Sequence, residues 1–129
     1  MSFLDPRVHG YLDYAAVLLL ALAPWLFGFG GTPAVLCYVL AASQLGMSLL
    51  TAYPLGIAKV IPFTVHGGVE LAVAIFLVVA PWLFGFDGVD AARNFFIAAG
   101  IGLGFVYLTT NYRAAQRYEG PRRERVATH

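Results

Sequence analysis

The chain has 129 residues, the length of a single domain, and 60% of them are apolar or aromatic while only 12% are charged. A soluble fold of this size has too little interior to bury so much apolar surface, so the composition places the chain in a lipid bilayer. The net charge of +1 argues against nucleic-acid binding, and the single cysteine, Cys37, forms neither an internal disulfide nor a cysteine zinc cluster.

The first apolar run is long enough to cross a bilayer and carries helix signals at both ends. Asp5 and Pro6 are an N-cap residue and a proline at the first helical position, and a glycine-rich stretch follows Phe27. The sequence therefore predicts a transmembrane helix that begins at Pro6 and ends at Phe27.

An alternative interpretation of this run is a cleaved signal peptide, because Ala21-Leu22-Ala23 resembles an A-x-A cleavage site. Two observations favour retention of the helix. Pro24 stands directly after the cleavage position, where proline is poorly tolerated, and a similar segment recurs at residues 65–88, where cleavage makes no sense.

Three further apolar runs predict three further spans. The second helix runs from about 33 to about 53, with Thr32 as its N-cap, and the third from 62 to about 84. The fourth runs from 91 to about 112, with Asp90 as its N-cap. The chain is thus expected to cross the membrane four times.

Residues 113–129 form a polar tail with five arginines and almost no apolar residues, so we expect this tail to be solvated. Arg7, Lys59 and the five tail arginines lie on one side of a four-span chain, and Arg93 lies alone on the other. The positive-inside rule therefore predicts that both termini are cytoplasmic.

The two halves of the apolar region are related by an internal repeat. A shift of 57 residues places Val8-His9-Gly10 on Val65-His66-Gly67, and the sequence APWLFGF at 23–29 on the same sequence at 80–86. Thirteen of the 24 positions from 8 to 31 are identical in the second copy. The first helix of the chain is therefore duplicated in the third.

The match continues into the second and fourth helices after a one-residue slip, which places Leu50-Thr51 on Leu108-Thr109. Residues 1–112 therefore contain two copies of a helical hairpin, at about 6–56 and about 62–112. Because each copy has two spans, both copies insert the same way up. The predicted fold is all-α: a four-transmembrane-helix bundle made of two tandem parallel helical-hairpin repeats.

These repeats resemble the SPW-repeat integral membrane proteins, whose repeat is a pair of transmembrane helices with a Ser-Pro-Trp signature in the first. The signature here reads Ala23-Pro24-Trp25 and Ala80-Pro81-Trp82, so alanine replaces serine in both copies. The resemblance covers residues 6 to about 112 and implies a small protein of a bacterial-type inner membrane. It implies no established activity.

The signature has a structural interpretation. A proline inside a helix frees the carbonyl four residues earlier, here those of Leu20 and Leu77, and tryptophan favours the headgroup level of a membrane. The alternative is that the kinks and aromatic rings shape a pocket for a lipid or a quinone-like ring.

Small residues four apart lie on one face of the second helix of each hairpin and predict close helix packing. They are Ala42 and Gly46 in the first copy and Gly100 and Gly104 in the second.

The most chemically specific feature is a histidine followed four residues later by an acid in each copy. The pairs are His9 with Asp13 and His66 with Glu70, and the i, i+4 spacing puts both members of a pair on one helix face. Acids inside a membrane span are costly, so these pairs should face the bundle interior and converge around the repeat axis. The four groups suit a divalent metal or a proton-exchanging cluster; the alternative is pairing that only supports the helices.

The sequence favours a membrane protein without enzymatic activity that packs into a homo-oligomer or a larger assembly of membrane proteins. Its expected partners are the lipid bilayer and such proteins, with no nucleic acid. The alternative is an ion- or proton-handling protein, or a small membrane enzyme, that uses the histidine and acid pairs. No HExxH, CxxC, P-loop or G-x-S-x-G motif is present, and the sequence requires no cofactor, although a divalent metal is possible.

Overall fold

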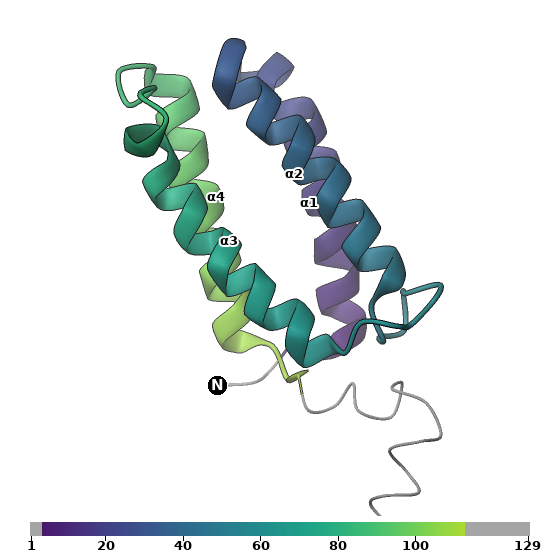
Figure 1. The fold of residues 1–129 in the computed structure, drawn as a ribbon. Coiled ribbons are helices and arrows are strands. Elements are labelled where there is room, and N and C mark those ends of the chain that lie inside the picture. The colour runs from purple at the N-terminus through teal and green to yellow at the C-terminus, as the bar shows by residue number, and fades with distance from the viewer. Residues whose placement is uncertain (1–3, 113–129) are drawn as a thin grey trace, which may run out of the picture.

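The computed structural model describes residues 4–112, which form two helical hairpins (Figure 1). The helices in this part of the chain are α1 (Pro6–Phe27), α2 (Gly31–Leu50), α3 (Phe63–Leu83) and α4 (Asp90–Thr109). All four are long and apolar enough to cross a membrane, and α1 packs on α2 as α3 packs on α4. The predicted all-α bundle of two hairpins is confirmed, whereas the tail at 113–129 lies outside the described residues.

The start and end of α1 follow from the signals in its sequence. The Asp5 side chain accepts a hydrogen bond of 2.9 Å from the Val8 amide, which satisfies one of the free amides of the first turn. Gly28 then adopts a left-handed conformation, with φ of 71°, and ends the helix.

Two predicted caps are wrong. The N-cap of α2 is Gly30, so Thr32 lies inside the first turn, and the N-cap of α4 is Val89, so Asp90 is the first residue of that helix. Neither cap residue accepts a hydrogen bond through its side chain. The acid at Asp90 instead lies in the first turn, where it opposes the helix dipole.

The second helix of each hairpin ends three residues before its predicted end, because the chain turns into extended pairing. Thr51 and Thr110 both have β-region backbone angles, and Thr51 pairs with Ile61 just as Thr110 pairs with Leu4. The segment before each odd-numbered helix is thus tied to the end of an even-numbered helix from the other hairpin.

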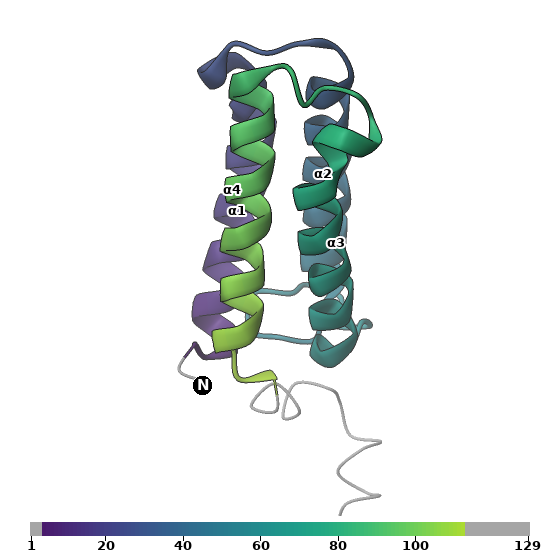
Figure 2. The ribbon, with the colours of Figure 1, turned by 90° about the vertical axis from the view of Figure 1, so that its left-hand side faces the viewer.

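The turns within the two hairpins lie at one end of the molecule. The long connection between α2 and α3 lies at the opposite end, together with the start of α1 and the end of α4 (Figure 2). We call this second end the terminal end. Both copies therefore run in the same direction, as the parallel repeat predicts.

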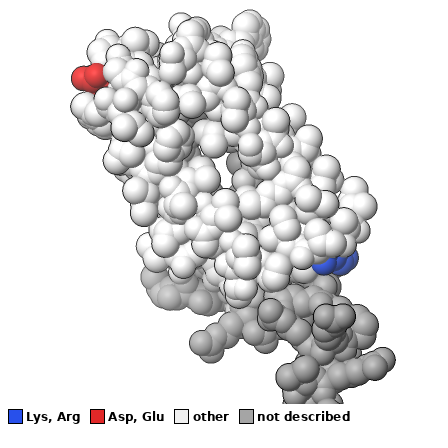
Figure 3. Space-filling view, viewed as in Figure 1, with Lys and Arg blue, Asp and Glu red and all other residues white. Residues whose placement is uncertain are grey.

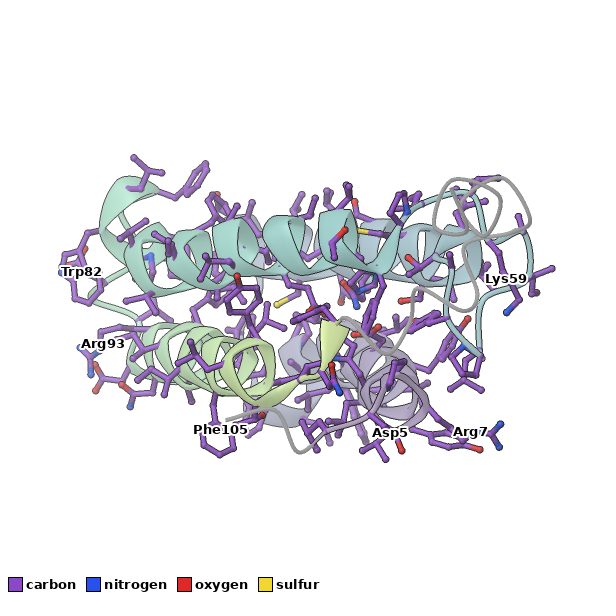
Figure 4. The ribbon with its side chains drawn as sticks, turned by 90° about the horizontal axis from the view of Figure 1, so that it is seen from below. Asp5, Arg7, Lys59, Trp82, Arg93 and Phe105 are labelled. Carbon is purple, nitrogen blue, oxygen red and sulfur yellow. The ribbon has the colours of Figure 1, made fainter. Side chains whose placement is uncertain are left out.

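Charged side chains occupy the two ends of the bundle. The face in Figure 3 is uncharged along its length, with a basic side chain at the terminal end and an acidic one at the other. Asp5, Arg7 and Lys59 lie at the terminal end, and Trp82 and Arg93 lie at the turn end (Figure 4). This distribution is that of a helical bundle with an apolar belt between two polar surfaces.

An apolar core near the turns holds the two hairpins together. Its aromatic contacts join Phe27 to Phe95, at a ring distance of 5.5 Å, and Phe29 to Phe96, at 6.5 Å. Ala23 and Cys37 are fully buried beside them. Nearer the terminal end, the same helix faces enclose polar side chains.

Of the four small residues predicted to allow close packing, Gly100 lies against a neighbouring helix of the described chain. A Cβ at Gly100 would lie 2.7 Å from the Ala74 carbonyl oxygen, so α3 and α4 are in close contact there. A Cβ at Gly46 or Gly104 would meet no atom of the described residues within 4 Å, and Ala42 is exposed.

The orientation of α2 about its own axis explains why Ala42 is exposed. After Pro33, its buried residues are Ala34, Cys37, Ala41 and Ser48, which follow a helical spacing of three, four and seven. Ala42 is one residue beyond this face and therefore points away from the neighbouring helices.

A candidate metal centre at the terminal end

The first turns of α1 and α3 carry the two pairs that the sequence singled out. His9 and His66 are 0% exposed, Asp13 is 3% exposed and Glu70 is 1% exposed. One helical turn separates the histidine from the acid in each pair, and the duplicated helices present equivalent faces to each other. The structure therefore brings together all four side chains, which we call the quartet.

Each histidine of the quartet contacts both acids through its Nε2 atom. His9 Nε2 lies 3.2 Å from Asp13 Oδ1 and 2.9 Å from Glu70 Oε2. His66 Nε2 lies 3.1 Å from Asp13 Oδ2 and 3.2 Å from Glu70 Oε1. The contacts cross between the hairpins as readily as they run within one helix, so the quartet is a single site.

The other ring nitrogen of each histidine contacts a threonine at the end of a helix in the opposite hairpin. His9 Nδ1 lies 2.8 Å from Thr110 Oγ1, and His66 Nδ1 lies 2.7 Å from Thr51 Oγ1. These hydroxyls lie beside the rings because α2 and α4 end directly before Thr51 and Thr110.

Two tyrosines donate hydrogen bonds to the acids. The Tyr53 hydroxyl donates to Asp13 Oδ2 at 2.9 Å, and the Tyr112 hydroxyl donates to Glu70 Oε2 at 3.1 Å. Burial and the Asp13 carboxylate raise the pKa of the Tyr53 phenol well above its ordinary value, and burial and Glu70 do the same for the pKa of Tyr112. Both phenols therefore stay protonated and remain donors near neutral pH.

Sequence analysis missed these threonines and tyrosines, although a signal for them is present. A shift of 59 residues places Thr51-Ala52-Tyr53 on Thr110-Asn111-Tyr112. The predicted slip of one residue aligned Thr51 with Thr109. At this point the slip is two residues, and Thr51 corresponds to Thr110. Thr109 instead donates to its own helix, at the Phe105 carbonyl.

The glycine after each histidine allows a neighbouring residue to pack closely. A Cβ at Gly10 would lie 2.7 Å from Leu55 Cδ1, and a Cβ at Gly67 would lie 2.6 Å from Tyr112 Cε1. The missing side chains allow Leu55 to pack against α1 at Gly10 and Tyr112 to pack against α3 at Gly67, where the Tyr112 ring lies 5.7 Å from the His9 ring.

The signature residues do not join the quartet. Pro24 and Pro81 are buried in the apolar core at the other end of α1 and α3, while Trp25 and Trp82 are 79% and 57% exposed. Exposed indoles at the end of a span fit the headgroup level, as the structural interpretation of the signature expects.

The quartet offers two imidazole nitrogens and two carboxylates, with one ligand atom from each residue and all four atoms within 4.8 Å of one another. Ligands of a tetrahedral zinc ion, at bonds of about 2.0–2.2 Å, lie about 3.3–3.6 Å apart. The nitrogen–oxygen contacts of 2.9–3.2 Å use both oxygens of each carboxylate, and one atom from each residue gives a set that spans up to 4.8 Å. Around a small ion the shortest contacts would open by a few tenths of an ångström and the longest would close by about one ångström. These residues therefore fit a small divalent ion.

Two parallel hairpins of membrane-spanning helices, joined around a buried polar site, define the class of this protein. The family model of the SPW repeat domain matches residues 7–110, which include both hairpins and the whole quartet. The chain therefore belongs to the SPW repeat family and is an integral membrane protein, which confirms the resemblance. No curated protein and no solved structure matches the chain.

Proposed function

We propose that this protein is an ion-handling membrane protein whose quartet binds one divalent metal ion between the two hairpins. The observation that carries the proposal is the convergence of four buried ligand atoms, two from each hairpin, within 4.8 Å of one another. The two carboxylates balance the charge of a divalent ion, so the loaded site is neutral and suits an apolar surrounding.

A purely structural role explains the quartet less well. Buried ion pairs contribute little to stability, and apolar side chains of similar volume join packed elements at least as firmly. The apolar core near the turns already joins the hairpins in this way. Two histidines and two acids at matched positions are therefore better explained by a ligand than by packing.

Metal analysis of the detergent-purified protein tests this proposal. We expect about one first-row divalent ion for each chain, and we expect none after His9→Ala and His66→Ala are combined, because half of the ligands are then missing. The matched control is His129→Ala, which removes the same side chain outside the quartet. Circular dichroism reports whether the helices persist in each variant. A wild-type protein that binds no divalent ion from a panel of Zn²⁺, Mn²⁺, Co²⁺ and Ni²⁺ would overturn the proposal.

We further propose that the protein lies in a bacterial-type inner membrane with the terminal end in the cytoplasm. Arg7 and Lys59 lie at that end and Arg93 at the other, and five more arginines follow α4 in the sequence. A reporter that is active only outside the cytoplasm, fused to His129, is expected to give no signal. The same reporter inserted between Gly85 and Gly88 is expected to be active, and the reverse pattern would contradict this orientation.

A second candidate function, as a component of a membrane assembly, is favoured by an open groove between α3 and α4. Its volume is about 290 Å³, and its lining contains no polar surface. The residues that line it are Leu71, Ala74, Ile75, Val78, Val79, Gly100 and Gly104. Within residues 4–112, no atom lies within 4 Å of the Cβ position of Gly104, so this glycine leaves room for a helix from a second copy of this chain.

The variant Gly104→Leu tests this candidate, because its side chain would fill the groove from a position where the Cβ meets no described residue within 4 Å. If a second copy packs here, the oligomer in detergent should dissociate while the helices keep their thermal stability. Gly46→Leu is the matched control in the other hairpin, where the added Cβ also meets no neighbour. An unchanged oligomer size for Gly104→Leu would remove the groove as an interface.

A further inference from the structure

The hydrogen bonds around the quartet fix which nitrogen of each histidine carries a proton. Both rings have the same two sets of neighbours: carboxylates at Nε2 and a threonine hydroxyl at Nδ1. A carboxylate can only accept, so Nε2 carries a proton in the metal-free site, and whether Nδ1 also carries one follows from what the threonine hydroxyl can do.

The threonine hydroxyls have one proton each, and both protons are already used. Thr51 Oγ1 donates to the Met47 carbonyl at 2.6 Å, and Thr110 Oγ1 donates to the Val106 carbonyl at 2.6 Å. These carbonyls belong to the last turns of α2 and α4, where the regular helical partners are missing. Each threonine oxygen can therefore only accept from the histidine, so each Nδ1 carries a proton.

We infer that Thr51 and Thr110 are positioning residues that hold His66 and His9 as Nδ1–H tautomers, and that they thereby make the quartet selective for a first-row transition-metal ion such as Zn²⁺. The inference rests on the proposed function and names the class of ion that the site takes. Nε2 donates to the carboxylates in the metal-free site. Because Nδ1 keeps its proton for the threonine, the proton that each ring releases to a metal ion is the one on Nε2, and the freed lone pair then points to the centre of the quartet.

Two imidazole nitrogens with two carboxylates are a ligand set of intermediate softness. Zn²⁺ and its neighbours in the first transition row accept such nitrogen and oxygen ligands in four-coordinate sites. Ca²⁺ takes six to eight oxygen ligands, and Mg²⁺ demands oxygen in an octahedron and keeps several waters. The quartet has two oxygen-bearing residues, and all four of its side chains are buried, so it suits the first group of ions and not the second.

The hydrogen bonds between the histidines and the threonines also join the two hairpins. His9 on α1 depends on Thr110 at the end of α4, and His66 on α3 depends on Thr51 at the end of α2. A carbonyl or hydroxyl that accepts from the far nitrogen of a metal-bound histidine commonly changes metal affinity 10–100-fold when it is removed. We expect the metal affinity to fall by this factor when both threonine hydroxyls are removed.

The test compares metal binding by detergent-purified wild-type protein and three variants. The first variant, T51V/T110V, keeps the shape of both side chains and removes both hydroxyls. The second, T51S/T110S, restores the hydroxyls. The third, T109V, is a matched control, because the Thr109 hydroxyl also donates to a carbonyl four residues earlier but has no recorded hydrogen bond to His9 or His66. Co²⁺ serves as the probe, since its visible absorption reports coordination geometry, and Zn²⁺, Mg²⁺ and Ca²⁺ are the competitors.

For the wild type we expect a four-coordinate Co²⁺ spectrum that Zn²⁺ abolishes and that excess Mg²⁺ or Ca²⁺ leaves intact. T51V/T110V should bind Co²⁺ about 10–100-fold more weakly with an altered spectrum, and T51S/T110S and T109V should behave as the wild type.

Four results would contradict the inference or the proposed function. Wild-type affinity and spectrum in T51V/T110V, or displacement of Co²⁺ by Mg²⁺ or Ca²⁺, overturn the inference and leave the proposed function standing. An equal loss in T109V assigns the effect to the helix ends and also overturns it. A wild-type protein that binds none of these ions overturns the proposed function itself.

Discussion

Combining Asp13→Asn with Glu70→Gln is expected to remove metal binding almost completely. The change keeps the size of both side chains and the acceptor oxygens for Tyr53 and Tyr112, but it takes away the two negative charges that balance the ion. The affinity should fall by more than the roughly 10–100-fold typical of an outer contact. Metal content and competition with a chelating dye measure this loss.

The matched control for this experiment is the pair Asp87→Asn and Asp90→Asn, which changes the net charge equally at the turn end. Both of these acids are exposed, and Asp90 pairs only with the nearby Arg93 among the described residues. We expect metal binding to be unchanged in the control. Equal affinity in the quartet variant and the control would show that the quartet is not the binding site.

Two glycine-to-alanine changes on α4, one turn apart, are expected to have opposite effects on stability. At Gly100 the new Cβ would lie 2.7 Å from the Ala74 carbonyl oxygen and 2.7 Å from Val78 Cγ2, closer than packed atoms come. Gly100→Ala should therefore lower the free energy of unfolding by about 1–3 kcal/mol, as overpacked interiors do. At Gly104 the Cβ meets nothing, so Gly104→Ala should raise it by up to about 1 kcal/mol through helix propensity.

Unfolding in detergent with increasing sodium dodecyl sulfate, followed by circular dichroism, measures both changes. The two variants carry the same substitution on the same helix, one turn apart. If Gly100→Ala is as stable as Gly104→Ala, then α3 and α4 do not cross closely at Gly100.

Much of the fold follows from short-range features of the sequence. The cap at Asp5, the glycine after Phe27 and the length of the apolar runs set the helices, and the duplicated APWLFGF segment sets two equivalent hairpins. Even the meeting of His9 with His66 follows, because acids in a span avoid lipid and equivalent faces of a parallel repeat meet on its axis.

The contacts that surround the quartet depend on details that periodicity does not contain. Thr51 and Thr110 reach the histidines only because α2 and α4 end at Leu50 and Thr109, and that end is set by pairing with Ile61 and Leu4, which are distant in sequence or belong to the other hairpin. The rotation of α2, which leaves Ala42 exposed, likewise follows from how whole helix faces pack and not from residue spacing alone.

The crossed pairing of histidines and threonines has a consequence for how such a site can arise. A chain with one of these hairpins would carry one histidine, one acid, one threonine and one tyrosine, which is half of the set. Two such chains side by side would complete it as a dimer, so occupancy would depend on protein concentration. In the fused chain the two copies are tethered, so each copy is always at a high effective concentration near the other. Fusion also frees each half to change separately, and the difference of one methylene between Asp13 and Glu70 is a change of this kind.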